Sequence, residues 1–181
     1  MNYIFPFLIA AAPAWAQSCP DAPDHSAALG QLIHDVQNAP DEMSARLISS
    51  EMWFYWADAP DDHAQELLDE GMGRRKSYDF DGAMIAFNAL VDYCPDYAEG
   101  YNQRAYVNFL RENYREALPD LERTIQLSPK HVAALAGQAL TFSALERNGE
   151  AAVALRKALV LNPWLSERHL LPALEATEQE L

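Results

Sequence analysis

Three prolines divide the second half of the chain at a fixed interval. Pro95, Pro129 and Pro163 follow one another every 34 residues. The same interval separates a set of alanines and a set of bulky apolar residues, namely Ala83, Ala117 and Ala151, and Phe87, Leu121 and Leu155. A period of about 20 to 50 residues is typical of proteins built from stacked copies of one structural unit. The spacing therefore predicts three stacked repeats.

Each repeat is expected to contain two helices. Proline ends a helix because it has no amide hydrogen and clashes with the preceding turn, so each proline marks the end of a second helix. Turn-forming residues at 78–82, 112–114 and 147–149 separate the two helices of each pair. Small residues occupy the point in each first helix where two helices would cross closely, at Gly71, Ala105 and Ala139. The pattern predicts an all-α protein of antiparallel helix pairs.

With each proline at position 32, the repeats span residues 64–97, 98–131 and 132–165. Their small and bulky positions resemble the tetratricopeptide-repeat (TPR) family, in a secreted bacterial form. The resemblance covers about 100 residues. It implies a superhelical solenoid whose first helices line a concave groove, and in relatives this groove usually receives a peptide.

The segments outside the repeats are expected to cap the solenoid. Residues 17–63 would form an N-terminal tail and a helical cap, with helices over 26–37 and 43–57. The aromatic cluster Trp53 to Trp56 is expected to cover the first repeat, with part of it exposed or in contact with a partner. Residues 166–181 would form a C-terminal capping helix, because the last apolar face of a solenoid needs a polar cover.

The first 16 residues resemble a signal peptide. An apolar run ends at Ala14-Trp15-Ala16, which a signal peptidase could cut before Gln17. The run is too short for a membrane-spanning helix. We therefore expect a secreted protein, with the bacterial periplasm as the favoured compartment and no membrane insertion after cleavage.

The chain has two cysteines, Cys19 and Cys94. An even pair in an oxidising compartment favours a disulfide, and closing a loop of about 75 residues would stabilise the fold by roughly 4 kcal/mol. Two unpaired thiols and a lipidated Cys19 are the alternatives.

Composition and motifs exclude several functions. Asp and Glu outnumber Lys and Arg by 27 to 13, and the resulting negative potential repels nucleic acid and anionic lipid. The five histidines are scattered, without metal-ligand spacing, and no catalytic motif is present. We expect no metal, no cofactor and no enzyme activity, and a protein or peptide as the partner.

The TPR resemblance implies which residues face the groove. The partner-binding residues expected from it are Met72, Arg75, Glu99, Asn102, Tyr106 and Phe109. Family members that grip the charged tails of chaperones carry Lys, Arg and Asn at five groove positions. Here those positions hold Leu68, Met72, Gln103, Ala133 and Gly137, so the sequence does not predict a chaperone-tail adaptor.

Polar residues are concentrated in and after the second repeat. Arg104, Asp120 and His131 are expected to form a polar network, together with Asn102. Two interpretations stay open: a buried network that fixes the second repeat against the third, or a ligand site on the groove floor. The first hypothesis for the function is a scaffold that binds a segment of a partner protein in the groove. The alternative is a small-molecule-binding or enzymatic role centred on Asn102, Arg104 and His131.

Overall fold

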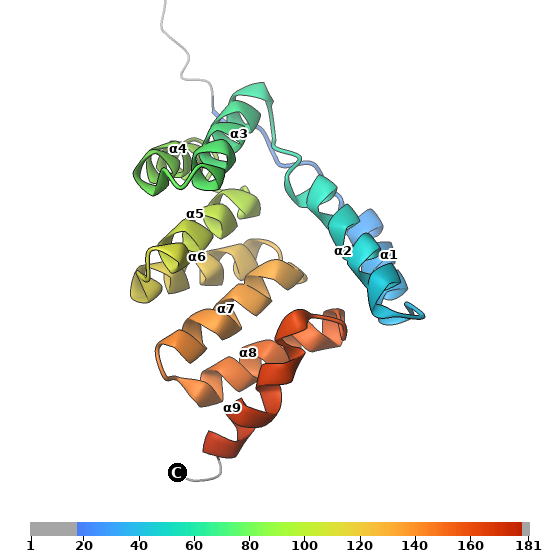
Figure 1. Cartoon of the computed structure of the whole chain (residues 1–181). Helices are drawn as coiled ribbons and strands as arrows, with labels where there is room; N and C mark the ends of the chain where they lie inside the picture. Colours follow the sequence, from blue (N-terminus) through green and yellow to red (C-terminus); the bar gives the residue numbers. More distant parts are fainter. Residues whose placement is uncertain (1–17, 179–181) are drawn as a thin grey trace, which may run out of the picture.

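The computed structural model describes residues 18–178, so the predicted signal peptide at 1–16 lies outside the described residues. Within 18–178 the chain is entirely helical (Figure 1). Its elements are α1 (Ser26–Gln37), α2 (Glu42–Trp56), α3 (Asp62–Lys76), α4 (Phe80–Tyr93), α5 (Ala98–Leu110), α6 (Tyr114–Leu127), α7 (Val132–Ala144), α8 (Asn148–Leu161), the 3-10 helix η1 (Ser166–Leu170) and α9 (Leu171–Glu178).

Helices α3 to α8 form three antiparallel pairs that stack into a curved array (Figure 1). The small residues of the 34-residue pattern lie where the helices of a pair cross. A Cβ atom added to Gly71 would lie 2.3 Å from Cε1 of Phe87, and Ala105 and Ala139 are buried at the matching points of the next pairs. The alternation of small and bulky residues therefore brings the two backbones of each pair close together.

Local signals set where these helices begin and end. Tyr78, Glu112 and Glu146 follow the first helix of each pair with φ values of 63°, 61° and 60°, the left-handed conformation that ends many helices. Side-chain oxygens of Asp61 and Asp79 then accept hydrogen bonds from backbone amides at the start of α3 and α4. These bonds hold the pKa of both carboxyl groups below the usual range.

The α1–α2 hairpin does not continue the stack. Helix α2 lies along the concave side of the repeats (Figure 1), and Met52 and Trp56 share a buried cluster with Val132 at the start of α7. Within the aromatic cluster of α2, Trp56 thus packs against the start of the third repeat as well. Pro60 prevents α2 from running on into α3, and the chain changes direction between the two helices.

Both ends of the described chain are fastened to the repeats. A disulfide joins Cys19 to Cys94, with a Cα–Cα distance of 5.1 Å, and so ties the segment before α1 to the end of α4. At the other end, Leu174 of α9 is buried against Leu155 and neighbouring residues of the third repeat. Helix α9 thus covers the last apolar face of the solenoid.

Candidate partner-binding site

The concave face contains a cavity of about 500 Å³. Its walls come from α2, from the first helices α3, α5 and α7, and from the segment that follows α8. Apolar side chains form much of the lining, including Met52, Met72, Phe109, Leu140 and Leu165. Because α2 lies over the concave side, the site is a half-open cleft between the hairpin and the repeats, in place of the fully open groove expected of a solenoid.

Five of the six residues predicted for the groove line this cavity, and they are Met72, Arg75, Asn102, Tyr106 and Phe109. The three from α5 share one face because their spacing of three and four residues matches the helical turn. The guanidinium of Arg75 lies over the ring of Tyr106, with its Cζ atom 4.7 Å from the ring centroid. Two neighbouring first helices thereby contact each other at the cavity wall.

Glu99, the sixth predicted groove residue, lies in a buried network behind the cavity. Its carboxylate accepts hydrogen bonds from Nδ2 of Asn102 (3.1 Å), Nε2 of Gln103 (2.5 Å) and Nε2 of His131 (2.9 Å). Nδ1 of His131 accepts from the backbone amide of Ala134 (3.2 Å), so the ring proton sits on Nε2. A buried carboxylate needs such donors, and Glu99 therefore joins α5 to the start of α7.

The same network reaches the hairpin through an aromatic stack. The rings of Trp56 and His131 lie nearly parallel, with centroids 4.2 Å apart and an angle of 14° between their planes. The hydroxyl of Tyr97 donates to the backbone oxygen of Trp56 at 2.7 Å. Burial, followed by the nearby Glu99, raises the pKa of this phenol. The end of α2 is thus anchored to the last residues of the first and second repeats, Tyr97 and His131.

Arg104 and Asp120 form a separate pair. Two guanidinium nitrogens of Arg104 donate to the carboxylate of Asp120 at 2.8 Å and 2.6 Å, and a third donates to Asn88 at 3.0 Å. The bond to Asp120 raises the pKa of Arg104. Residues two apart on a helix lie on nearly opposite faces, so Arg104 does not meet Asn102. The predicted network divides in two, and the centre expected from Asn102, Arg104 and His131 does not form.

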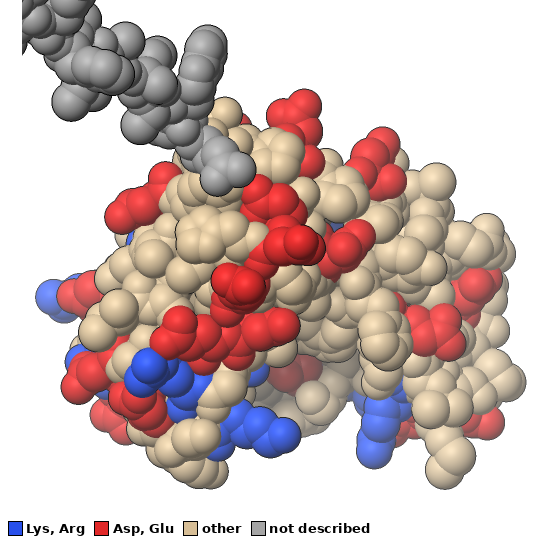
Figure 2. Space-filling view, turned by 90° about the horizontal axis from the view of Figure 1, so that it is seen from above, with Lys and Arg blue, Asp and Glu red and all other residues tan. Residues whose placement is uncertain are grey.

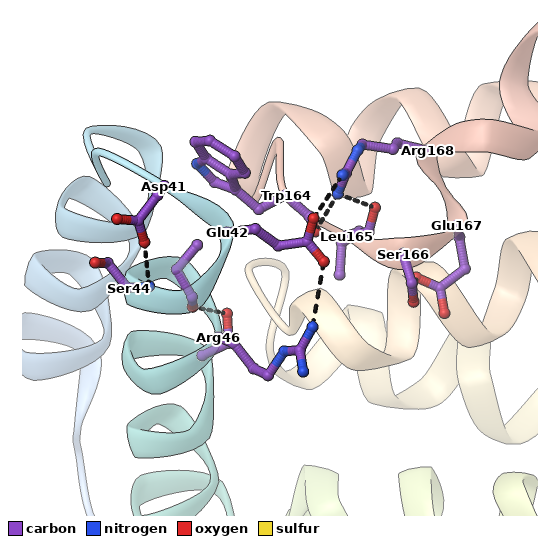
Figure 3. A network of polar contacts seen from close by, with 11 residues as sticks. Asp41, Glu42, Ser44, Arg46, Trp164, Leu165, Ser166, Glu167 and Arg168 are labelled. Atoms are coloured by element: carbon purple, nitrogen blue, oxygen red, sulfur yellow. Dashed lines mark hydrogen bonds and ion pairs between the residues drawn. The ribbon is translucent and has the colours of Figure 1, made fainter.

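Polar contacts fasten the other end of α2 beyond the third repeat (Figure 3). Arg168 of η1 donates to the carboxylate of Glu42 at 3.0 Å and to the backbone oxygen of Trp164 at 2.7 Å, and its bond holds the pKa of Glu42 below the usual range. Asn162 donates to the hydroxyl of Ser49 at 3.0 Å. These contacts close the cavity on the side away from the first repeat.

Three buried polar atoms in the described part of the chain have no hydrogen-bond partner: Nε1 of Trp56, Nε of Arg75 and Oε1 of Gln103. All three residues line the cavity. A buried polar atom without a partner costs roughly 1–3 kcal/mol, and in native proteins such atoms are few. The sequence indicated Gln103 only as a position where the chaperone-tail residues are missing, and Trp56 only as part of the aromatic cluster of residues 53–56.

The surface at the α3 end of the molecule is acidic (Figure 2). Viewed from the α3 end, Asp and Glu side chains spread over the molecule, whereas Lys and Arg gather in small groups (Figure 2). Across residues 18–178 no three His, Cys, Asp or Glu side chains are arranged to hold a metal ion. No helix in the same range is both long and apolar enough to cross a membrane.

Known proteins share this architecture. No protein-family model matches the chain. A TPR repeat-containing protein of Rhizobium etli is 29% identical over 118 residues, which cover 64% of this chain and 56% of that protein. A tetratricopeptide repeat protein 36 homolog of Nematostella vectensis is 41% identical over 73 residues, 40% of each chain. This chain therefore spans about half the length of the curated relatives it matches.

Solved structures match the helical array itself. The first TPR domain of Spaghetti (RPAP3), bound to an HSP90 peptide, superposes with a TM-score of 0.62 at 20% identity, covering 65% of this chain and 94% of that domain. The helical array therefore has the TPR fold. MamA of Desulfovibrio magneticus aligns over 88% of both chains with a TM-score of 0.59 and 18% identity. The TPR resemblance and the all-α solenoid predicted from the 34-residue spacing are confirmed.

Proposed function

We propose that this TPR protein is a non-catalytic binding module that holds a short segment of a partner protein between α2 and the first helices of its repeats. The observation that carries the proposal is the cavity of about 500 Å³ lined by Met72, Tyr106, Phe109 and other groove residues. Ligand sites of this kind have volumes of about 300–1,000 Å³ and largely apolar walls. The cavity is large enough for a few residues of an extended segment.

The solved relatives support a peptide-binding role but a different ligand. The structure of Spaghetti contains an HSP90 peptide, and that of a yeast Sti1 domain is a complex with an Hsp70 peptide. In this chain, four of the five positions that carry polar and charged groups in chaperone-tail binders line the cavity as uncharged residues, namely Met72, Gln103, Ala133 and Gly137. We therefore propose a partner segment that is not a charged chaperone tail.

The proposed compartment is the bacterial periplasm, and the partner is then another exported protein. The Cys19–Cys94 disulfide supports this part of the proposal, because disulfides persist in oxidising compartments. The expected signal peptide agrees with it.

Capture of partners by the purified protein tests the groove assignment. The double variant Tyr106→Ala plus Phe109→Ala removes two aromatic walls of the cavity. Phe54→Ala is the matched control, because Phe54 lies on α2, is 78% exposed and does not line this cavity. We expect the wild type and the control to capture the same exported protein and the double variant to lose it at least tenfold. A partner that the double variant retains, with its helix content unchanged, would place binding elsewhere.

A further inference from the structure

The unpartnered atoms indicate what chemistry the cavity accepts. Trp56 of α2 and Gln103 of α5 both line the cavity, and each has one buried polar atom without a partner, the indole N–H of Trp56 and the amide oxygen of Gln103. The orientation of the Gln103 amide is fixed, because its nitrogen donates to Glu99 and its oxygen is left over. A ligand that satisfies both residues must present one acceptor and one donor.

A peptide group is the unit of a protein segment that presents both. Its carbonyl oxygen accepts from an N–H, and its own N–H donates to a carbonyl. We propose that the partner segment places one uncharged apolar side chain in the cavity, and that the adjoining peptide group bonds to Trp56 and Gln103. This inference rests on the proposed function and adds the identity of the bound group.

The rest of the lining favours an uncharged side chain. Met52, Met72 and Leu140 surround the space, and a charged group among them would lose its hydration without an equivalent partner. The charged side chains in the lining are Arg75 and Glu167. The guanidinium of Arg75 already lies over Tyr106, while its unpartnered Nε can donate to a further carbonyl of an extended segment.

The hairpin is then half of the binding site. Trp56 belongs to α2, whereas Gln103 belongs to the second repeat, so the two hydrogen-bonding groups come from different elements of the cavity wall. The stack of Trp56 on His131 and the bond from Gln103 to Glu99 hold both side chains through one buried network. Binding therefore depends on the hairpin remaining in place over the repeats.

Titration of the ¹⁵N-labelled protein with small capped peptides tests this inference. The probes are acetyl-Ala-X-Ala-amide with Leu, Phe, Asp or Lys at X, and a Leu analogue in which an ester oxygen replaces the amide N–H of residue X. The indole N–H signal of Trp56, assigned with the Trp56→Phe variant, is the readout. The signal of Trp164 is the internal control, because Trp164 packs beside the hairpin but does not line the cavity.

We expect the Leu and Phe peptides to shift the Trp56 signal saturably while leaving that of Trp164 in place. Because one hydrogen bond is lost, the ester should bind the wild-type protein about tenfold more weakly, and Trp56→Phe should weaken the Leu peptide to a similar degree. The comparison of the ester with the amide peptide uses the wild-type protein, so it does not depend on how Trp56→Phe folds.

Each of the following results would overturn the inference: binding of the Asp or Lys peptide as tight as that of Leu, an ester that binds as well as the amide, or no binding by any peptide. A peptide that shifts Met72 and Phe109 signals but not the Trp56 indole would also overturn it. That last result would leave the proposed function standing, because the groove would still bind peptide. The proposed function fails separately, if the groove double variant retains its captured partner.

Discussion

The three repeats and the α1–α2 hairpin are both helical, but they are held in place differently. Each repeat packs along whole helices against its neighbours, through small and bulky residues that recur every 34 positions. The hairpin is held by separate side-chain contacts with residues far along the chain, such as Ser49 with Asn162, 113 residues apart, and Glu42 with Arg168, 126 apart. The difference teaches that one chain can combine a periodic scaffold with a separately attached element that completes its binding site.

The largest expected loss of stability comes from replacing a core residue of the stacked repeats. Phe87 is fully buried in the first repeat, and Phe87→Ala should lower the free energy of unfolding by about 3–5 kcal/mol. The matched control Phe54→Ala, on the exposed side of the hairpin, should change it by less than about 0.5 kcal/mol. Denaturant unfolding followed by circular dichroism measures both. Equal losses would mean that Phe54 is not on a free face.

The second-largest expected effect tests whether the hairpin unfolds independently of the repeats. Met52 is 1% exposed, between the hairpin and the third repeat, and Met52→Ala should cost about 2–5 kcal/mol. Because the hairpin attaches as a unit, we expect hydrogen exchange to accelerate in α1 and α2 while α3 to α8 keep their protection. Uniform acceleration through all the helices would show that hairpin and repeats unfold together.

Substitution of two glycines on α3 tests whether α3 and α4 cross closely at Gly71. Gly71→Ala would press its new Cβ against Phe87 and should destabilise the protein by about 1–3 kcal/mol. Gly73→Ala, on the same helix, meets no atom within 4 Å and should stabilise it by up to about 1 kcal/mol, because alanine favours helix. Thermal unfolding of the two variants should therefore move in opposite directions. A shift in the same direction would contradict the assigned packing.

The smallest effect concerns the ion pair at the start of α2. Arg168 lowers the pKa of Glu42 in the folded protein, so the pair stabilises the hairpin above about pH 4.5, and this contribution is lost as the pH falls through the folded pKa. The protection factors of the hairpin amides, which correct for the pH dependence of intrinsic exchange, should fall on acidification in the wild type and fall less in Glu42→Gln. Glu51→Gln, which removes the same charge from the same helix, should keep the wild-type pH dependence.

The repeats and much of the groove could be predicted because their determinants are local and repeated. The 34-residue interval identified Gly71 and Phe87 as a crossing point, and the TPR resemblance placed Asn102, Tyr106 and Phe109 in the groove. The position of the hairpin could not be predicted, because it depends on contacts such as Trp56 on His131 that no periodic pattern encodes. The role of Glu99 was missed for the same reason, since its partner His131 lies at the far end of the same repeat, 32 residues away.

The central claim is that α2 lies over the concave face against the third repeat. Nuclear Overhauser contacts from the indole ring of Trp56 test it most directly. With the ring centroids 4.2 Å apart, strong contacts from Trp56 to the His131 ring and to the methyl groups of Val132 are expected. Contacts from Trp56 to α3 and α4 alone, as for a hairpin stacked on the end of the first repeat, would contradict the account.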